Sequence, residues 1–431
     1  MKRILIITEL FYPMNRIGAI RPTKLAKFLQ KNNYEVTVFT SAKCLSDIHI
    51  EPSFPYSVIY APQTKEELPT NSKYTVAQKA INSDQKLNKF LYELKLVKRQ
   101  TIAYKDGKAF LASFVKALDE FTLSLNDFDC VFSTFGPVGS LLAGMEAKKR
   151  KPSLIWINDF RDPMVSQIMP KSFAPYYWHL QKKSIKNADY TVTVSEGYKK
   201  RISYRNISKE ILVIPNGFDK EEQVAFHCSK KLFSFAYVGT LYEGKRDISI
   251  LFKFLKELMS EGVLNSDNTI FHYAGNDGAF LKSQASRFGL EKIIQDHGNV
   301  NREMSLQIQA EARFLVLATW NDKGEEGVFP GKILEYMLME KPIISIVGGL
   351  LPNSEVSQTI RQLRLGVSCE EADPQSMEEL RDWLFMQVEE YNNGNKAYFV
   401  PDLAAVSQRF SWENIVERFC ELINGKKEHF C

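Results

Sequence analysis

One loop in the C-terminal half combines residue types suited to hold a nucleotide. Residues 321–344 read NDKGEEGVFPGKILEYMLMEKPII, a polar loop that runs into a short apolar helix. Gly331 permits close approach of a ligand to the backbone, and the helix start beyond it supplies N–H donors. Lys332 adds a positive charge for a phosphate, and Glu335 can accept hydrogen bonds from ribose hydroxyls. We therefore expect a nucleoside diphosphate here; the alternative is a Lys–Glu pair on a helix surface.

A second candidate phosphate site lies in YVGTLYEGKRD, residues 237–247. Gly239 ends an apolar strand and leaves room for a ligand, while Lys245 and Arg246 offer positive charge to a phosphate. The alternative is a basic pair on the surface near a helix start. The helix dipole disfavours cations at that position, which favours the phosphate interpretation.

The stretch WINDFRDPM, residues 156–164, places charged residues directly after an apolar strand. Asp159, Arg161 and Asp162 would lie at the carboxyl end of that strand, where active sites of parallel sheets form. Two carboxylates beside an arginine can position a sugar hydroxyl or act in acid–base catalysis. A salt-bridged structural turn is the competing interpretation.

The loop FYPMNRIGAIRP, residues 11–22, has a single glycine, Gly18, before a helix and no GxGxxG fingerprint. This weighs against a dinucleotide-dependent enzyme. Gly18 still lets a ligand approach the N–H groups of the helix start, and Arg16 and Arg21 beside it are candidates to meet an anion on the acceptor side. An ordinary helix entry with two exposed arginines is the alternative.

The elements that must position these residues alternate between strands and helices. Short β-branched runs end directly before the candidate loops, and segments with helical spacing separate them. The order predicts an α/β protein with two doubly wound, Rossmann-like domains. We expect the first domain at 1–220, rejoined by the C-terminal helix 404–431, and the second at 232–403. Two such sheets would face each other across a cleft, suited to a two-substrate reaction.

Composition narrows the class of protein. The six cysteines form no CxxC pair and the six histidines no metal-binding motif, so we expect a reduced, cytoplasmic protein that needs no metal or other cofactor. No apolar stretch reaches the roughly 18 residues of a membrane span. Nothing resembles a nucleic-acid-binding motif, and we expect no nucleic-acid partner.

Charge is unevenly distributed along the chain. The net charge is +5, but residues 73–116 hold ten Lys/Arg against three Asp/Glu, with apolar residues at near-helical spacing. Such a segment could contact an anionic membrane surface, and the enzyme would then work at the inner face of the plasma membrane. The alternative is a core-facing helix with a solvated lysine face.

Together these stretches resemble the family-4-like glycosyltransferases, which have GT-B architecture, two facing Rossmann-like domains with a cleft between them. The pieces that carry the resemblance are WINDFRDPM, VSEGYKKRI followed by VIPNGFD, VGTLYEGKRD and FPGKILEYMLMEKPII. The subgroup that the chain looks most like assembles bacterial capsule, O-antigen and other surface polysaccharides. The resemblance implies a retaining, metal-independent hexosyl- or N-acetylhexosaminyltransferase with a UDP- or GDP-sugar donor and a saccharide or lipid-linked saccharide acceptor.

The resemblance also implies roles for individual residues. Gly18, Gly239 with Lys245 or Arg246, and Lys332 would lie near the donor diphosphate, Glu335 near the ribose, and Asp159 near the reacting sugar. If the enzyme instead inverts the anomeric configuration, Asp159 or Asp162 is the candidate general base.

The chain departs from the family pattern at two places. Many relatives carry a histidine near the position of Asp159. The family's first glutamate would fall at Gly327, so either Glu326 reaches the sugar through a shifted loop or the backbone amides of 327–329 replace it. A nucleotide-sugar epimerase of the same architecture and a non-catalytic nucleotide-sugar-binding subunit stay open as alternatives.

Overall fold

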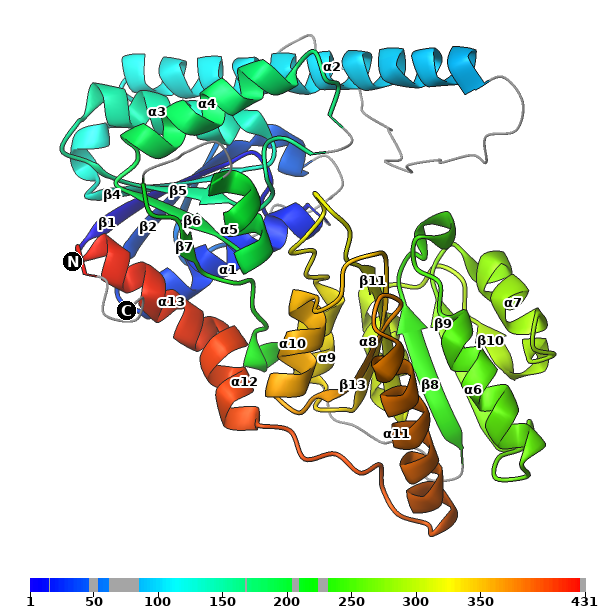
Figure 1. Ribbon diagram of the computed structural model, residues 1–431. Coiled ribbons are helices and arrows are strands. Elements are labelled where there is room, and N and C mark those ends of the chain that lie inside the picture. The colour runs from blue at the N-terminus through cyan, green and yellow to red at the C-terminus, as the bar shows by residue number, and fades with distance from the viewer. Residues whose placement is uncertain are drawn as a thin grey trace. The chain divides into compact units, whose positions relative to one another are not determined.

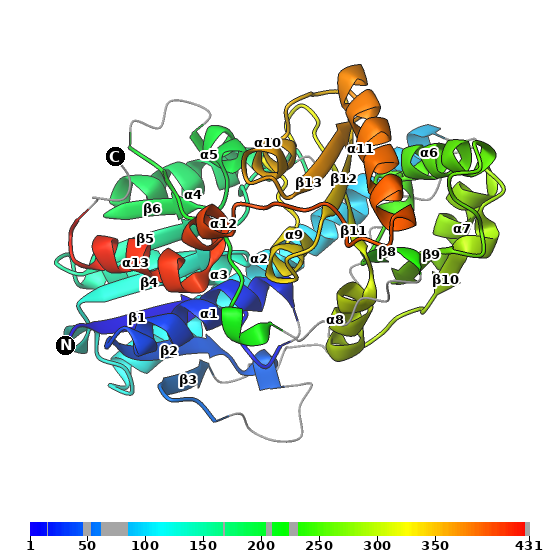
Figure 2. The same ribbon diagram turned by 90° about the horizontal axis from the view of Figure 1, so that it is seen from below.

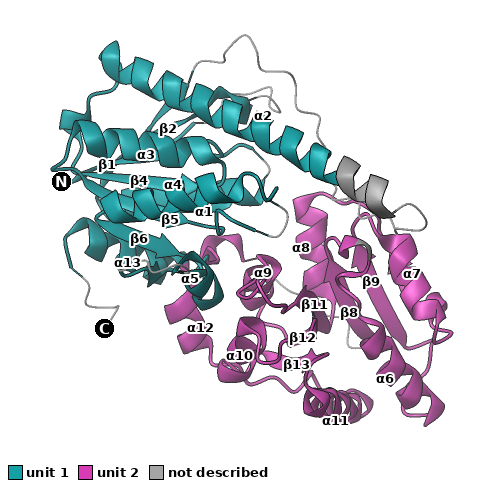
Figure 3. Ribbon diagram, turned by 45° about the horizontal axis from the view of Figure 1, so that its top comes forward, with its two compact units in different colours: residues 1–74, 79–216, 412–431 teal, residues 75–78, 217–411 magenta. Residues whose placement is uncertain are grey.

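The computed structural model describes residues 1–14, 16–45, 53–61, 85–166, 169–203, 209–223 and 232–426. Within these ranges the side chains of 85–91 and of 243 are not described. The chain divides into two compact units (Figure 3). The first comprises residues 1–74, 79–216 and 412–431, and the second is formed by 217–411 with residues 75–78.

The first unit is built on a seven-stranded parallel sheet with the order β3-β2-β1-β4-β5-β6-β7. Its strands are β1 (Arg3–Thr8), β2 (Glu35–Ser41), β3 (Ser57–Ala61), β4 (Cys130–Phe135), β5 (Ile155–Phe160), β6 (Tyr190–Thr193) and β7 (Leu212–Val213). Ile4 of β1 aligns with Val36 on one side and with Cys130 on the other. Residues 4–7 of β1 are all inaccessible to solvent. Burial on both faces explains why this strand is a continuous apolar run.

Helices cover both faces of this sheet (Figures 1 and 2). They are α1 (Ile17–Lys31), α2 (Gln85–Asp119), α3 (Val138–Arg150), α4 (Ala174–Asn187), α5 (Glu196–Ser203) and α13 (Trp412–Ile423), with 3-10 turns η1 (Ala42–Leu45) and η2 (Leu125–Asp127). The α2–α5 side has one apolar core, and the α1–α13 side has another. Phe28 of α1 stacks on Trp412 of α13 with ring centroids 6.2 Å apart, which fixes the C-terminal helix to the first unit.

The second unit has a six-stranded parallel sheet with the order β10-β9-β8-β11-β12-β13. Its strands are β8 (Phe233–Val238), β9 (Thr269–Ala274), β10 (Ile294–Asp296), β11 (Phe314–Trp320), β12 (Ile343–Gly348) and β13 (Gly366–Glu370). Its helices are α6 (Ser249–Ser260), α7 (Gly278–Ser286), α8 (Arg302–Glu311), α9 (Lys332–Leu338), α10 (Glu355–Gln362), α11 (Pro374–Asn392) and α12 (Leu403–Phe410), with 3-10 turns η3 (Lys220–Glu222), η4 (Tyr242–Gly244) and η5 (Glu291–Ile293). One core joins β8 to α6, α7 and α11, and the other joins it to α8, α9, α10 and α12.

Both units are therefore doubly wound α/β domains, and the predicted fold class is confirmed at the level of each domain. Strand order reverses between β1 and β4 in the first sheet and between β8 and β11 in the second. Ligands of open parallel sheets bind beyond the carboxyl ends of the strands at such reversal points. The loops after these four strands are where the site residues must be sought.

The C-terminal region differs from the single helix that we expected over 404–431. Helix α12 belongs to the second unit, because Val406 and Phe410 pack into its core. Phe218 donates its backbone N–H to the carbonyl of Phe410 at 2.9 Å, so both segments that link the units run side by side. The chain re-enters the first unit only at Trp412.

Candidate functional site

The loop after β8 carries the first group of expected donor-site residues. Gly239 has φ +135°, a conformation that side-chain-bearing residues rarely adopt. Its N–H donates to the carbonyl of Ala274 at 2.8 Å, and its own carbonyl accepts from the Tyr273 hydroxyl at 3.0 Å. The chain can therefore turn sharply at the edge of the sheet and present Lys245 and Arg246 there.

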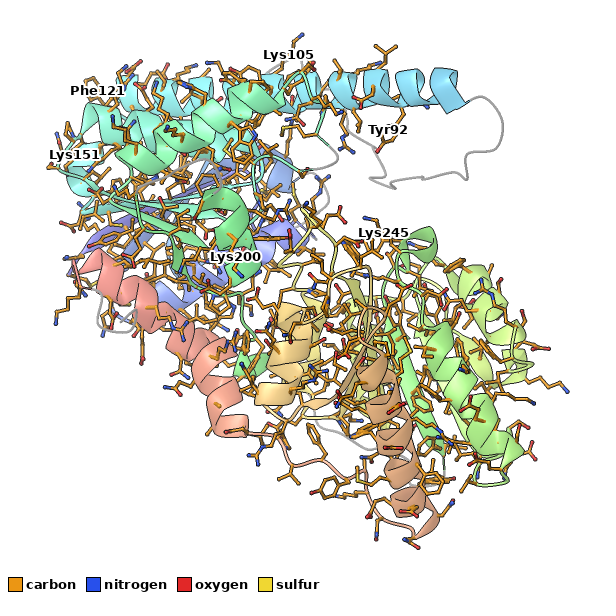
Figure 4. The ribbon with its side chains drawn as sticks, in the orientation of Figure 1. Tyr92, Lys105, Phe121, Lys151, Lys200 and Lys245 are labelled. Atoms are coloured by element: carbon orange, nitrogen blue, oxygen red, sulfur yellow. The ribbon has the colours of Figure 1, made fainter. Side chains whose placement is uncertain are left out.

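Lys245 and Arg246 lie against aromatic rings at the carboxyl end of β11. Lys245 Nζ is 4.7 Å from the centroid of the Trp320 indole, and the Arg246 guanidinium is 4.5 Å from the Tyr242 ring. Lys245 Nζ also pairs with a carboxylate oxygen of Glu325 at 2.9 Å. Figure 4 shows Lys245 at the end of β8. The two cations thus converge at the strand-order reversal of this sheet, a position suited to bind an anion.

Glu335, in the first turn of α9, is held by three donors. Lys332 Nζ approaches one carboxylate oxygen at 2.8 Å and the Gln309 amide donates to the same oxygen at 3.2 Å, while Arg302 lies 3.4 Å from the other. The Glu335 side chain is 20% exposed, so these partners leave part of it open to solvent. Beside it, Gly331 has open space where a Cβ would point.

Lys332 and Glu335 therefore form the ion pair that was the alternative interpretation of their spacing, within a larger network, and their contact with a nucleotide stays a prediction. Arg302 extends this network by pairing with Glu222 at 2.9 Å. Sequence reasoning missed Arg302 and Gln309, because both come from α8, about 30 residues earlier. Gln309 is fully buried among apolar residues of α8, so the sequence of this helix gave no signal that its side chain meets Glu335.

The loop before α9 places its two adjacent glutamates differently. Glu326 accepts from the N–H of Gly324 at 2.8 Å, a contact within its own loop. Glu325 is the residue that pairs with Lys245. The structure therefore brings Glu325 into contact with the basic loop after β8, and the contact of Glu326 with the sugar stays a prediction. Because Glu325 and Glu326 are adjacent, the sequence could not show which of them pairs with Lys245.

In the first unit, Asp159 and Arg21 form one buried ion pair. Asp159 is the fifth residue of β5 and Arg21 lies in α1, and their side chains are 0% and 1% exposed. An Arg21 terminal nitrogen is 2.9 Å from one carboxylate oxygen, and the Thr134 hydroxyl donates to the other at 2.8 Å. Arg21 also donates to the carbonyls of Ile214 and Pro215, each at 2.9 Å. This geometry favours a structural role for the pair over direct contact with a substrate.

Arg161 connects the two loops at the strand-order reversal of the first sheet. Its terminal nitrogens donate to the carbonyl oxygens of Gly18 and Gly136, which follow β1 and β4 respectively. A Cβ at Gly18 would lie 2.4 Å from an Arg161 nitrogen, so the position requires glycine for this close approach. Asp162 lies 3.7 Å from Arg161 Nε and is 58% exposed. Arg16 is exposed and caps the start of α1 through its backbone.

The sequence gave no indication of one titratable group, Glu9, at the carboxyl edge of the first sheet. Glu9 directly follows β1, is buried, and accepts from the N–H groups of Gly139 at 2.7 Å and Ser140 at 3.3 Å. Burial raises the pKa of Glu9 to about 7, although both N–H groups act to lower it. Gly107 and Gly139 meet beside it, where a Cβ on Gly139 would lie 2.6 Å from the carboxylate.

The described residues contain neither a metal-binding cluster nor a membrane-spanning helix. Among them, no group of three or more His, Cys, Asp or Glu side chains is arranged to hold a metal ion. None of the helices within the described ranges is both long and apolar enough to cross a bilayer.

Comparison with known proteins gives one family match and several similar folds. Residues 22–222 match the model of Glycosyltransferase Family 4. No curated protein matches the chain in sequence. Among solved structures, the chain is similar to a sucrose-phosphate synthase from Thermosynechococcus elongatus, with a TM-score of 0.63, 13% identity and 99% of each chain covered.

Two enzymes of lipopolysaccharide synthesis have the same fold. The outer core galactosyltransferase WaaB gives a TM-score of 0.56 at 16% identity, covering 98% of this chain and 99% of WaaB. The glycosyltransferase WaaG gives 0.52 at 12% identity, covering 98% and 100%. The family match covers less than half of the chain, and these structures show that the chain shares their fold, with two Rossmann-like domains.

Proposed function

We propose that the protein transfers a sugar from a UDP- or GDP-linked donor to an acceptor hydroxyl during the synthesis of a bacterial surface polysaccharide such as capsule or O-antigen. The observation that carries the proposal is the convergence of Lys245 and Arg246 at the strand-order reversal of the second sheet. A diphosphate is the anion that a glycosyltransferase must bind and release. The Lys332–Glu335 pair supports the same assignment, because it combines a phosphate-binding cation with an acceptor for ribose hydroxyls.

The proposed reaction is a front-face displacement that retains the anomeric configuration. The acceptor hydroxyl attacks the anomeric carbon as the bond to the donor phosphate oxygen breaks, and that oxygen takes the hydroxyl proton. Lys245, Arg246 and Lys332 stabilise the negative charge that develops on the leaving diphosphate. These cations fulfil the role that a divalent metal has in other transferases, so the reaction needs no added metal.

The acceptor is proposed to be a saccharide, free or lipid-linked, that binds the first unit. Helix α2 supports a lipid-linked acceptor. Its N-terminal half extends beyond α3 and α4 (Figure 1). The exposed residues Leu94, Lys98, Ile102 and Lys105 recur at intervals of three or four, which places them on one face of the helix.

The basic face of α2 is chemically suited to an anionic bilayer. The cations Lys95, Lys98, Arg99, Lys105 and Lys108 form no ion pair with any described residue. Each such cation near an anionic surface contributes about 1 kcal/mol. The rest of the basic segment, residues 73–84, lies outside the described residues. We place the enzyme in the cytoplasm at the inner face of the plasma membrane.

Activity assays test the function directly. The protein is incubated with UDP- and GDP-hexoses and N-acetylhexosamines, saccharide acceptors and EDTA, and the product is examined by NMR. We expect donor consumption only with acceptor, a retained anomer and no loss of rate in EDTA. Lys332→Ala should reduce kcat/KM roughly 10- to 100-fold. An inverted product would exclude the retaining mechanism, and epimerised donor without acceptor would establish an epimerase instead.

Membrane contact has its own test. Co-sedimentation with phosphatidylglycerol vesicles should fall at high salt and in the variant Lys95→Gln/Lys98→Gln/Lys105→Gln. The variant Lys253→Gln/Lys256→Gln/Lys282→Gln, with the same charge change in the second unit, is the control. Binding that responds to neither salt nor the α2 substitutions would overturn this part of the proposal.

A further inference from the structure

Trp320 lies at the carboxyl end of β11, one of the two central strands of the second sheet. It is the last residue of β11, and β11 neighbours β8 at the point where strand order reverses. The loop that follows β8 supplies Tyr242, Lys245 and Arg246, and the loop that follows Trp320 supplies Glu325. An indole at this position lies between the two loops that must receive a ligand of this domain.

The indole contacts three side chains of the β8 loop. Its centroid is 4.7 Å from Lys245 Nζ and 5.6 Å from the Arg246 guanidinium carbon, and the Tyr242 ring meets it edge-on at 6.0 Å and 75°. A cation over an aromatic face is attracted by the negative face of the ring. Trp320 therefore holds both cations of the proposed phosphate site in place.

Two hydrogen-bond donors in this cluster have no partner among the described residues. Trp320 Nε1 and Arg246 Nε are both buried, and neither donates to a described group. A buried donor that lacks an acceptor is costly and therefore rare in folded proteins. Because an indole N–H can only donate, the missing partner must be an acceptor such as an oxygen atom.

We propose that Trp320 is a further binding residue of the donor site, whose indole N–H donates to an oxygen of the donor diphosphate. Its ring face meanwhile keeps Lys245 and Arg246 directed at the same group. This rests on the proposed function, because it takes a nucleoside diphosphate as the ligand. It adds a neutral, directional contact to a site otherwise built from charges, and such a contact fixes the orientation of the diphosphate.

Calorimetric titration of UDP and GDP into the full-length protein tests this assignment. Trp320→Phe retains an aromatic ring for the cations and removes the N–H. We expect the dissociation constant of the nucleoside diphosphate that binds to rise about ten-fold, with an unchanged melting temperature. Uridine or guanosine, measured by competition, should bind with the same affinity as before, because neither carries a phosphate.

Trp383→Phe is the matched control. Trp383 is half-buried in α11 and packs on Phe314, with ring centroids 5.5 Å apart, outside the β8 and β11 loops. Trp383→Phe should leave the affinity for the nucleoside diphosphate and the affinity for the nucleoside unchanged. If Trp320→Phe binds the diphosphate as tightly as the native protein, or loses nucleoside affinity to the same extent, the assignment of the N–H is wrong while the proposed function stands. If the native protein binds neither UDP nor GDP, the assignment of the Trp320 N–H and the proposed function are both wrong.

Discussion

The buried carboxylate of Asp159 belongs to a network that joins distant parts of the first unit. Its partner Arg21 lies 138 positions away and also binds the carbonyls of Ile214 and Pro215 at the end of the sheet. The sequence placed Asp159 at the carboxyl end of its strand and Arg21 beside the start of a helix. It could not pair them, because a contact over this separation depends on strand order and leaves no local spacing pattern.

The first prediction concerns the stability of this pair. Asp159→Asn keeps the shape of the side chain but leaves the Arg21 charge buried and unpaired, and should cost about 3–5 kcal/mol. Asp162→Asn removes an exposed charge whose partner is 3.7 Å away, and should cost less than about 1 kcal/mol. Urea unfolding followed by circular dichroism measures both. If Asp159→Asn abolished turnover without loss of stability, Asp159 would be a catalytic residue.

Glu9 gives the second prediction, on pH dependence. Its folded-state pKa of about 7 lies above the ordinary value of 4.5, so the folded protein binds more protons than the unfolded chain between these values. The free energy of unfolding should therefore fall as pH rises through this window. Glu9→Gln cannot ionise and should gain stability relative to the native protein by up to ~3 kcal/mol between pH 4.5 and 8.

Unfolding of Glu9→Gln and the native protein at several pH values tests this difference. Gln can still accept from the N–H of Gly139, so the variant keeps the local hydrogen bond. Lys43 and Asp106 also influence Glu9, by lowering and raising its pKa respectively, and both are retained in the variant. A stability difference that does not change with pH would contradict the raised pKa.

At the scale of elements, the apolar strands were the most predictable part of the chain. The runs that became β1, β4, β5, β8 and β11 are buried on both faces, so they read as continuous β-branched and aromatic segments. β13 gave no such pattern, because its sequence GVSCE has a single β-branched residue and no aromatic residue. Glu370 is buried there and accepts from the N–H of Ser354 at 2.8 Å and from the Ser357 hydroxyl at 2.6 Å. Burial of a carboxylate among serines cannot be read from composition.

The end of α2 gives the third prediction. Phe121 follows the helix with φ +56° and is 90% exposed, so an aromatic residue occupies a backbone conformation that favours glycine. Phe121→Gly should raise the free energy of unfolding by about 0.5–1 kcal/mol, since relief of the left-handed conformation outweighs the added freedom of the unfolded chain. Phe121→Ala removes the same ring but keeps a Cβ, and should give no gain. Equal stabilisation by both would assign the effect to the exposed ring.

At the scale of the whole molecule, the division into two doubly wound domains could be predicted from sequence, but the contacts within the candidate site could not. The predicted cations Lys245 and Lys332 both lie in the second unit, at the carboxyl edge of one sheet. Their partners Glu325, Trp320 and Glu335 come from the loop before α9, from β11 and from α9. Which of several polar side chains meets a cation is decided by packing, so a motif identifies the loop but leaves the contacts undetermined.

The fourth prediction follows from the separate cores of the two units. A ligand that binds only the folded state of one unit stabilises that unit by RT ln(1 + [L]/Kd), about 2.7 kcal/mol at 100 times Kd. With a saturating nucleoside diphosphate, hydrogen exchange should slow most in β8, β11 and the turn before α9, all in the second unit. Exchange in the core strands β1 and β4 of the first unit should change little.

Mass spectrometry of the exchanging protein resolves these segments, and Lys332→Ala should reduce the protection at a fixed ligand concentration. The comparison of the two sheets is internal to each sample, so it is independent of protein concentration and of global changes in solvent. Because each unit has its own pair of apolar cores, protection confined to β1 and β4 would mean that the nucleotide binds the first unit. The assignment of Lys245, Arg246 and Lys332 to the donor would then be wrong.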